Sequence, residues 1–250
     1  LLLSFFLFFF FFFFFVPLSS GAYRVAVDGR NYSSADGTLQ LSAHTASSGA
    51  DALGAYNSST LEWRAGSTGV QWQTTFRMYA ESLVFEQLYV TAVTNASVGH
   101  QDFLSSAFPA LRCLDVSGFG FYQFVGDGVP ASNPRYGAWP PADLASGWEL
   151  ANGALALFNA AFAPTVVLSS FAGFMTQNLH YAAGNLAFGL QGRVEAVPAG
   201  YRHSTILHAG TDGFGATMSS WGDQLLLRAG KPKGLWKTDF SMRFLGYTTG

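Results

Sequence analysis

The clearest periodic pattern in the chain runs from Val70 to Tyr79, where apolar and polar residues alternate. Trp72, Phe76 and Met78 fall on one face of an extended segment, and polar residues fall on the other. A period of two over ten residues predicts a β-strand with one buried face. The apolar run Leu83–Val90 begins only a few residues later, so we expect the two segments to pair as a hairpin.

Shorter segments with strand character precede and follow this hairpin. They are rich in aliphatic residues, and Gly, Pro or Asp-Gly pairs separate them. Many short strands with such punctuation predict an all-β fold, a large antiparallel β-sandwich. The segments are 25–30, 38–42, 155–158, 165–169, 186–190, 192–197 and 204–208.

A long insert, residues 126–148, interrupts this series of strands. It contains four prolines, which exclude a regular element there, and its length is typical of a functional or disordered segment. Tyr136, Trp139 and Trp148 can stack on a sugar, because the C–H faces of a pyranose ring are apolar. The alternative is that these side chains fix the insert to the sandwich.

The pattern changes to that of a helix near the C-terminus. Trp221, Leu225 and Leu226 can share one helix face, and Gly230 is a suitable residue to end the helix. All three lysines of the chain follow within residues 231–237. This charge cluster is typical of a solvated linker, and a phosphate-binding patch is the alternative.

The first sixteen residues are apolar apart from Ser4, and Pro17 and small residues follow up to Ala22. A helix of that length spans about 24 Å, which is short of the ~30 Å hydrocarbon core of a bilayer. We therefore predict a cleaved signal peptide over residues 1–22 and a secreted protein. The alternative is an uncleaved segment that anchors the protein in a membrane.

Composition supports secretion and excludes some partners. Three glycosylation sequons begin at Asn31, Asn57 and Asn95, and each marks an expected surface turn. A formal net charge of −2 provides no field that would attract nucleic acid. The only cysteine, Cys113, leaves no possibility of an intrachain disulfide.

The sequence provides no recognisable catalytic or metal-binding constellation. His203 and His208 are five residues apart, so on a strand they face opposite sides and cannot share a metal. The glycine-rich segment 210–215 lacks the dinucleotide-binding order, and we interpret it as an Asp-Gly hairpin turn. A glycosidase needs two carboxylates across the scissile bond, but spacing alone pairs none here. We expect no catalytic residue, cofactor or metal in this chain.

Several segments together resemble the region that precedes the catalytic barrel in secreted glycoside hydrolases. Their layout is similar to that of α-galactosidase and raffinose-synthase relatives and of the α-glucosidase family. The resemblance implies a galactose-mutarotase-like supersandwich ahead of a (β/α)8 barrel. It rests on residues 83–87, 197–201, 221–226 with 230–231, and 245–249.

The resemblance also implies a domain organisation. Residues 23–230 would form the sandwich, and residues 231–250 would form a linker and the first strand of a missing catalytic domain. The expected function is that of a non-catalytic N-terminal sandwich in a glycoside hydrolase, with carbohydrate and the missing barrel as partners. The alternatives are a stand-alone, lectin-like carbohydrate-binding module and a membrane-anchored surface protein.

Overall fold

Antiparallel strands dominate the part of the chain that the structure describes. The structure is a computed structural model. Its strands form three sheets, and a helix lies near the C-terminal end, which confirms the predicted antiparallel sandwich with a C-terminal helix. The segment expected to begin a barrel lies outside the described residues. The described residues are 18–99, 103–113, 118–123, 135–140, 148–150, 153–182, 184–234, 237–238 and 240.

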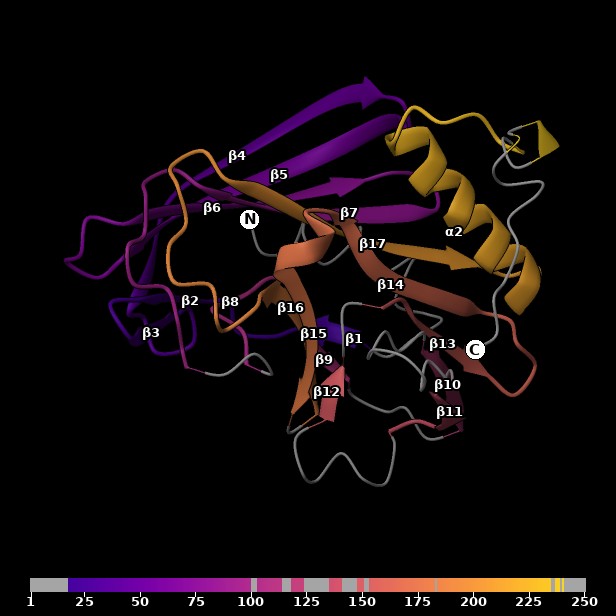
Figure 1. Ribbon diagram of the computed structural model, residues 1–250, viewed down its shortest axis with the longest axis horizontal. Helices are drawn as coiled ribbons and strands as arrows, with labels where there is room; N and C mark the ends of the chain where they lie inside the picture. The colour runs from indigo at the N-terminus through magenta and orange to yellow at the C-terminus, as the bar shows by residue number, and fades with distance from the viewer. Residues whose placement is uncertain are drawn as a thin grey trace.

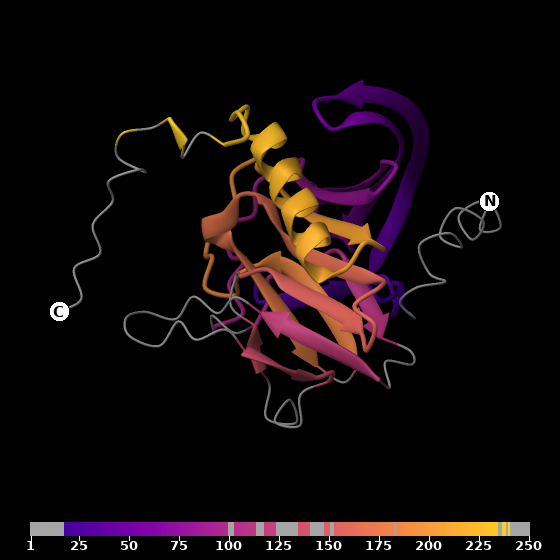
Figure 2. The ribbon, with the colours of Figure 1, turned by 90° about the vertical axis from the view of Figure 1, so that its right-hand side faces the viewer.

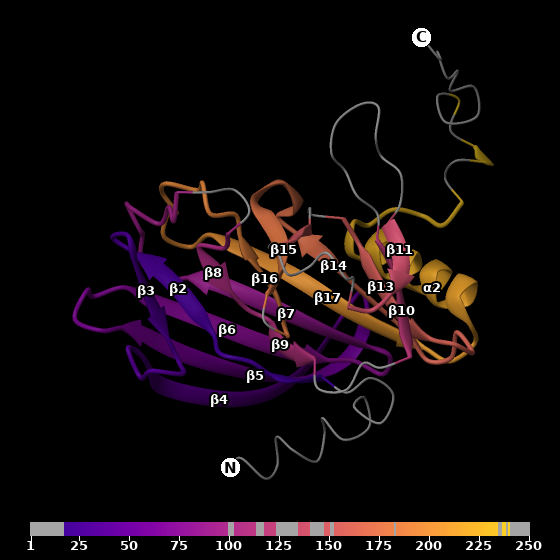
Figure 3. The same ribbon diagram turned by 90° about the horizontal axis from the view of Figure 1, so that it is seen from below.

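The largest sheet has nine strands and forms one layer of the sandwich (Figure 3). Every neighbouring pair in it is antiparallel. Across the sheet the order is β11 (Arg135–Ala138), β10 (Phe119–Gln123), β13 (Leu155–Asn159), β14 (Thr165–Ala172), β17 (Arg202–Gly210), β7 (Ser82–Tyr89), β6 (Gln71–Met78), β5 (Gly54–Ala65) and β4 (Leu39–Asp51).

Two smaller sheets pack against one face of the nine-stranded sheet, which we call the inner face. The five-stranded sheet has the order β1 (Leu18–Ser20), β9 (Ala110–Cys113), β16 (Asn185–Leu190), β15 (Gln177–Ala182) and β12 (Trp148–Leu150). The three-stranded sheet has the order β3 (Arg30–Ser33), β2 (Arg24–Val27) and β8 (Ser106–Ala107). A short 3-10 helix, η2 (Phe174–Thr176), precedes β15.

The hairpin predicted from the alternating pattern is confirmed as β6 and β7. Trp72 and Phe76 are buried, whereas Gln71 is exposed, and Phe76 lies opposite Phe85 in the register. Their rings meet edge to face with centroids 5.6 Å apart. The alternation therefore places one apolar row of each strand on the inner face.

Phe108 joins the layers at the centre of the core. Its ring meets the rings of Phe76 and Phe85 at centroid distances of 4.9 and 5.7 Å. Its backbone N–H donates to the carbonyl of Phe188 in β16 over 2.8 Å. Its carbonyl accepts a bond of 2.6 Å from Nε2 of Gln87 in β7. One residue thus contacts both the nine-stranded and the five-stranded sheet.

Helix α2 (Phe214–Arg228) covers the opposite, outer face of the nine-stranded sheet over β14 and β17 (Figure 1). Nε1 of Trp221 donates to Oγ of Ser169 over 3.0 Å, and Trp221 packs in a second apolar cluster with Ile206. The β4–β5 hairpin curls toward this side (Figure 2), and its Leu53 joins the same cluster. The helix starts before the predicted Trp221 and stops before Gly230, whose φ of 63° is the left-handed cap expected there.

Three segments differ from the prediction. The prolines of residues 126–148 predict no regular element, but β11 fits between Pro134 and Pro140 because its four residues include no proline. Residues 192–197 form no strand, although an isolated bridge joins Val197 to Val93. The glycine-rich segment 210–215 turns no hairpin, because Gly213, with a φ of 93°, leads directly into α2.

The described residues around the expected signal peptide also form structure. Leu18–Ser20 form strand β1, which pairs with Leu111–Cys113 in β9. Residues 1–17 lie outside the described part. Within the described residues, no helix combines the length and the apolar character needed to cross a bilayer.

His203 is a buried histidine without a hydrogen-bond partner in the described chain. It lies on the inner face of β17 opposite Gln87 and is only 1% exposed. Neither of its ring nitrogens has a partner among the described residues, and the ring of Tyr201 lies 5.9 Å away. Burial disfavours the charged imidazolium and lowers the pKa of His203 to about 3.

This burial predicts a loss of stability in acid. An unfolded histidine takes up a proton below about pH 6.5, whereas folded His203 stays neutral down to about pH 3. The free energy of unfolding should therefore fall as the pH drops through that window, by up to about 1.4 kcal/mol per pH unit. Urea denaturation of His203→Leu should lose about 2 kcal/mol less between pH 7 and pH 5 than wild type.

The matched control for this measurement is His44→Leu, which replaces an exposed histidine of β4. This variant controls for the exchange of a histidine for a leucine elsewhere in the same sheet. An equal loss in His203→Leu and wild type would contradict the assignment.

Candidate functional site

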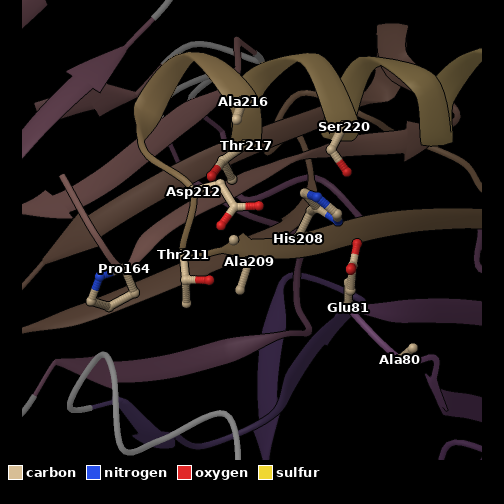
Figure 4. Close-up of a pocket in the computed structure, with 11 residues that line it drawn as sticks. Ala80, Glu81, Pro164, His208, Ala209, Thr211, Asp212, Ala216, Thr217 and Ser220 are labelled. Carbon is tan, nitrogen blue, oxygen red and sulfur yellow. The ribbon is translucent and has the colours of Figure 1, made fainter.

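A pocket of about 370 Å³ lies at the N-terminal end of α2 on the outer face (Figure 4). Segments far apart in sequence build it: the β6–β7 turn, the connection before β14, the end of β17 and the first turns of the helix. The lining residues are Ala80, Glu81, Pro164, His208, Ala209, Gly210, Thr211, Asp212, Ala216, Thr217 and Ser220.

His208 is held in one orientation at the base of this pocket. It is 1% exposed, and its Nδ1 forms a hydrogen bond of 2.8 Å with Oγ of Ser82. Burial lowers the pKa of His208, and the nearby carboxylate of Glu81 opposes this effect. Ser82 leaves Nε2 as the ring nitrogen available to the pocket.

Acidic and hydroxyl side chains surround this imidazole. Figure 4 shows Glu81, Asp212 and the ring of His208 pointing toward one another, with Ser220 above them on the helix. The backbone N–H of Ala209 donates to the carbonyl of Glu81 over 3.1 Å and ties the β6–β7 turn to β17. Among the residues that the structure describes, no group of His, Cys, Asp and Glu could hold a metal ion.

The sequence pattern does not bring the residues of this pocket together. His203 and His208 lie on opposite faces of β17, as the strand period predicts. Glu81 and Asp212 belong to no recognisable sequence motif. The pocket depends on the β17–α2 connection, which the sequence suggested was a hairpin turn.

Of the three predicted sugar-contacting aromatics, Tyr136 and Trp139 do not line this pocket. Tyr136 lies in β11 at one edge of the nine-stranded sheet and is 76% exposed. Trp148 begins β12 at an edge of the five-stranded sheet, where its backbone pairs with that of Tyr181. The side chain of Trp148 lies outside the described part.

Trp139 is a packing residue of the core and not an exposed aromatic residue. It is 3% exposed, and its ring meets those of Tyr181 and Phe121 at centroid distances of 5.0 and 5.8 Å. Tyr181 belongs to the five-stranded sheet and Phe121 to the nine-stranded sheet, so Trp139 lies between the two layers. The expectation that this ring offers a free face to a sugar is corrected, because neighbouring rings cover it.

The sequon asparagines are at the surface, but not all of them lie in turns. Asn31, Asn57 and Asn95 are all exposed. Asn31 lies in β3 and Asn57 in β5, whereas Asn95 lies outside the strands. Asn31 and Asn57 therefore do not lie in the expected turns, Asn95 lies in a segment without regular structure, and glycosylation itself stays a prediction.

The placement of the aromatics predicts opposite effects of two substitutions. Trp139→Ala should lower the free energy of unfolding by about 3–5 kcal/mol, because it empties a buried site between two sheets. Tyr136→Ala should change it by less than about 0.5 kcal/mol, since that ring is exposed. Urea denaturation at pH 7 measures both, and comparable stability of the two variants would show that Trp139 does not support the core.

Comparisons with known proteins identify the fold. No family model matches the chain, and no curated protein matches it. The GH36 α-galactosidase AgaB from Geobacillus stearothermophilus matches with a TM-score of 0.52 at 9% identity, over 82% of this chain and 32% of that chain. The α-N-acetylgalactosaminidase NagBb from Bifidobacterium bifidum matches with a TM-score of 0.52 at 9% identity, over 85% and 34%.

A third match is the GH36 α-galactosidase AgaA A355E D548N from the same Geobacillus, solved with raffinose. Its TM-score is 0.51 at 8% identity, and the match covers 82% of this chain and 32% of that chain. The chain thus spans about a third of the length of these structures. At such low identity the matches show the fold alone: this chain has the sandwich architecture found in glycoside hydrolases.

Proposed function

We propose that this chain is the non-catalytic N-terminal sandwich of a secreted glycoside hydrolase. The observation that carries the proposal is the asymmetry of the structural matches. They cover more than four-fifths of this chain but about a third of each α-galactosidase. The chain therefore corresponds to one part of such enzymes, and catalysis is assigned to a barrel that is not in this sequence.

Carbohydrate is the proposed partner of the complete protein. Two of the matched enzymes were solved with raffinose and GalNAc. In this chain, Tyr136 presents an exposed aromatic face on β11, and such a face suits the apolar side of a sugar ring. We propose that Tyr136 and the surrounding insert contribute to the wall of the sugar site beside the barrel.

The coding sequence beyond residue 250 tests this proposal. The reading frame should continue for several hundred residues in which strands alternate with helices, the pattern of a (β/α)8 barrel. The full-length product should hydrolyse p-nitrophenyl α-galactoside, and residues 1–250 expressed alone should not. A stop codon close to residue 250 in a confirmed transcript would contradict the enzyme and favour the lectin-like alternative.

Secretion is a separate part of the proposal. It is supported by the apolar segment ahead of Ala22 and by three exposed sequons. N-terminal sequencing of the protein from culture medium should give Tyr23 as the first residue, and peptide N-glycosidase F should lower its mass. Cleavage there would remove β1, so β9 would become an edge strand of its sheet. Retention of the protein in the membrane fraction with residues 1–22 attached would instead support the anchored alternative.

A further inference from the structure

The pocket under α2 has the size of a ligand site. Its volume of about 370 Å³ lies within the range of roughly 300–1,000 Å³ that is usual for small-molecule sites. A single hexose fits such a space. The pocket also lies on the outer face, away from the core between the sheets, so a ligand would not need to displace core side chains.

The lining groups define the chemistry of the ligand. Glu81 and Asp212 provide carboxylate oxygens that only accept hydrogen bonds, whereas Thr211 and Ser220 can both donate and accept. Among the described residues, no lysine or arginine lines the pocket, so the two carboxylates would repel an anion. A neutral molecule with several adjacent hydroxyl groups offers the donors that the carboxylates require.

The buried side chain of His208 distinguishes this pocket from an acidic patch on an exposed surface. It is almost wholly buried, its Nδ1 is already bonded to Ser82, and no described residue bonds its Nε2. Figure 4 shows the ring directed into the pocket between Glu81 and Ser220. This ring nitrogen is therefore open to the pocket, and a ligand hydroxyl can form a hydrogen bond with it.

We propose that this pocket binds a neutral, monosaccharide-sized polyhydroxyl molecule. Glu81 and Asp212 accept hydrogen bonds from its hydroxyl groups, and His208 fixes its orientation. The site is preorganised, because Ser82 holds the imidazole and the backbone bond from Ala209 to Glu81 fixes the turn. The proposal does not rest on the role in a glycoside hydrolase, since the described residues that line the pocket all belong to this chain.

The test is saturation-transfer NMR and isothermal titration calorimetry on the full chain with D-galactose, D-glucose and D-mannose. At least one sugar should bind wild type. Ala216→Leu puts three additional carbons into the pocket from α2 and should weaken that binding at least tenfold. Ser219→Leu is the matched control, because Ser219 is an exposed helix residue that does not line the pocket, and it should bind as wild type does.

The charge of the pocket gives a second readout. D-galacturonate should bind at least tenfold more weakly than D-galactose, and Asp212→Asn should reduce that difference because it removes one repelling carboxylate. Failure of all three sugars to bind would overturn the proposal, as would unchanged binding in Ala216→Leu. Binding that is lost in Tyr136→Ala but kept in Ala216→Leu would place the sugar on β11 and also overturn it. None of these results depends on whether a catalytic domain follows residue 250.

Discussion

The fold depends on the junction that Phe108 makes between its layers. Its backbone bonds to β16 and to the side chain of Gln87 in β7, and its ring lies among aromatic residues of the nine-stranded sheet. Gln87 is fully buried, so its amide must find a protein partner or lose the bond altogether. This hydrogen bond therefore fixes the spacing of the layers more specifically than apolar contact alone, which tolerates sliding.

The same constraint explains the place of Trp139. At the β10–β11 side of the nine-stranded sheet, the rings of Phe121, Trp139 and Tyr181 form a second contact between the layers. The insert that contains Trp139 begins in one sheet and reaches the other at β12, whose backbone pairs beside Tyr181. Trp139 belongs to this insert, and its buried ring fixes the insert between the two sheets through a large apolar contact area.

The sequence predicted the elements whose pattern is local and missed those whose partners are distant. The β6–β7 hairpin was predictable because Trp72 and Phe76 alternate with polar residues and one face is buried. The β4–β5 hairpin was not, since β4 is exposed along nearly its whole length and carries no apolar row. The helix was predictable from Trp221 and Leu225, but its start was not, because Gly213 suits either a turn or a helix N-terminus. The pocket was not predictable from the sequence, because its lining residues come from both halves of the chain.

The arrangement of β17 links the core to the pocket. Alternate residues of this strand face opposite layers: Leu207 packs in the core between the sheets, and His208 lines the pocket under α2. The strand also pairs with β7 and β14 along most of its length, so it cannot shift on one face without disturbing the other. The strand therefore holds His208 in place, whereas Glu81 and Asp212 reach the pocket from the connections that adjoin it. A ligand that binds only the folded chain would stabilise the whole sandwich by mass action.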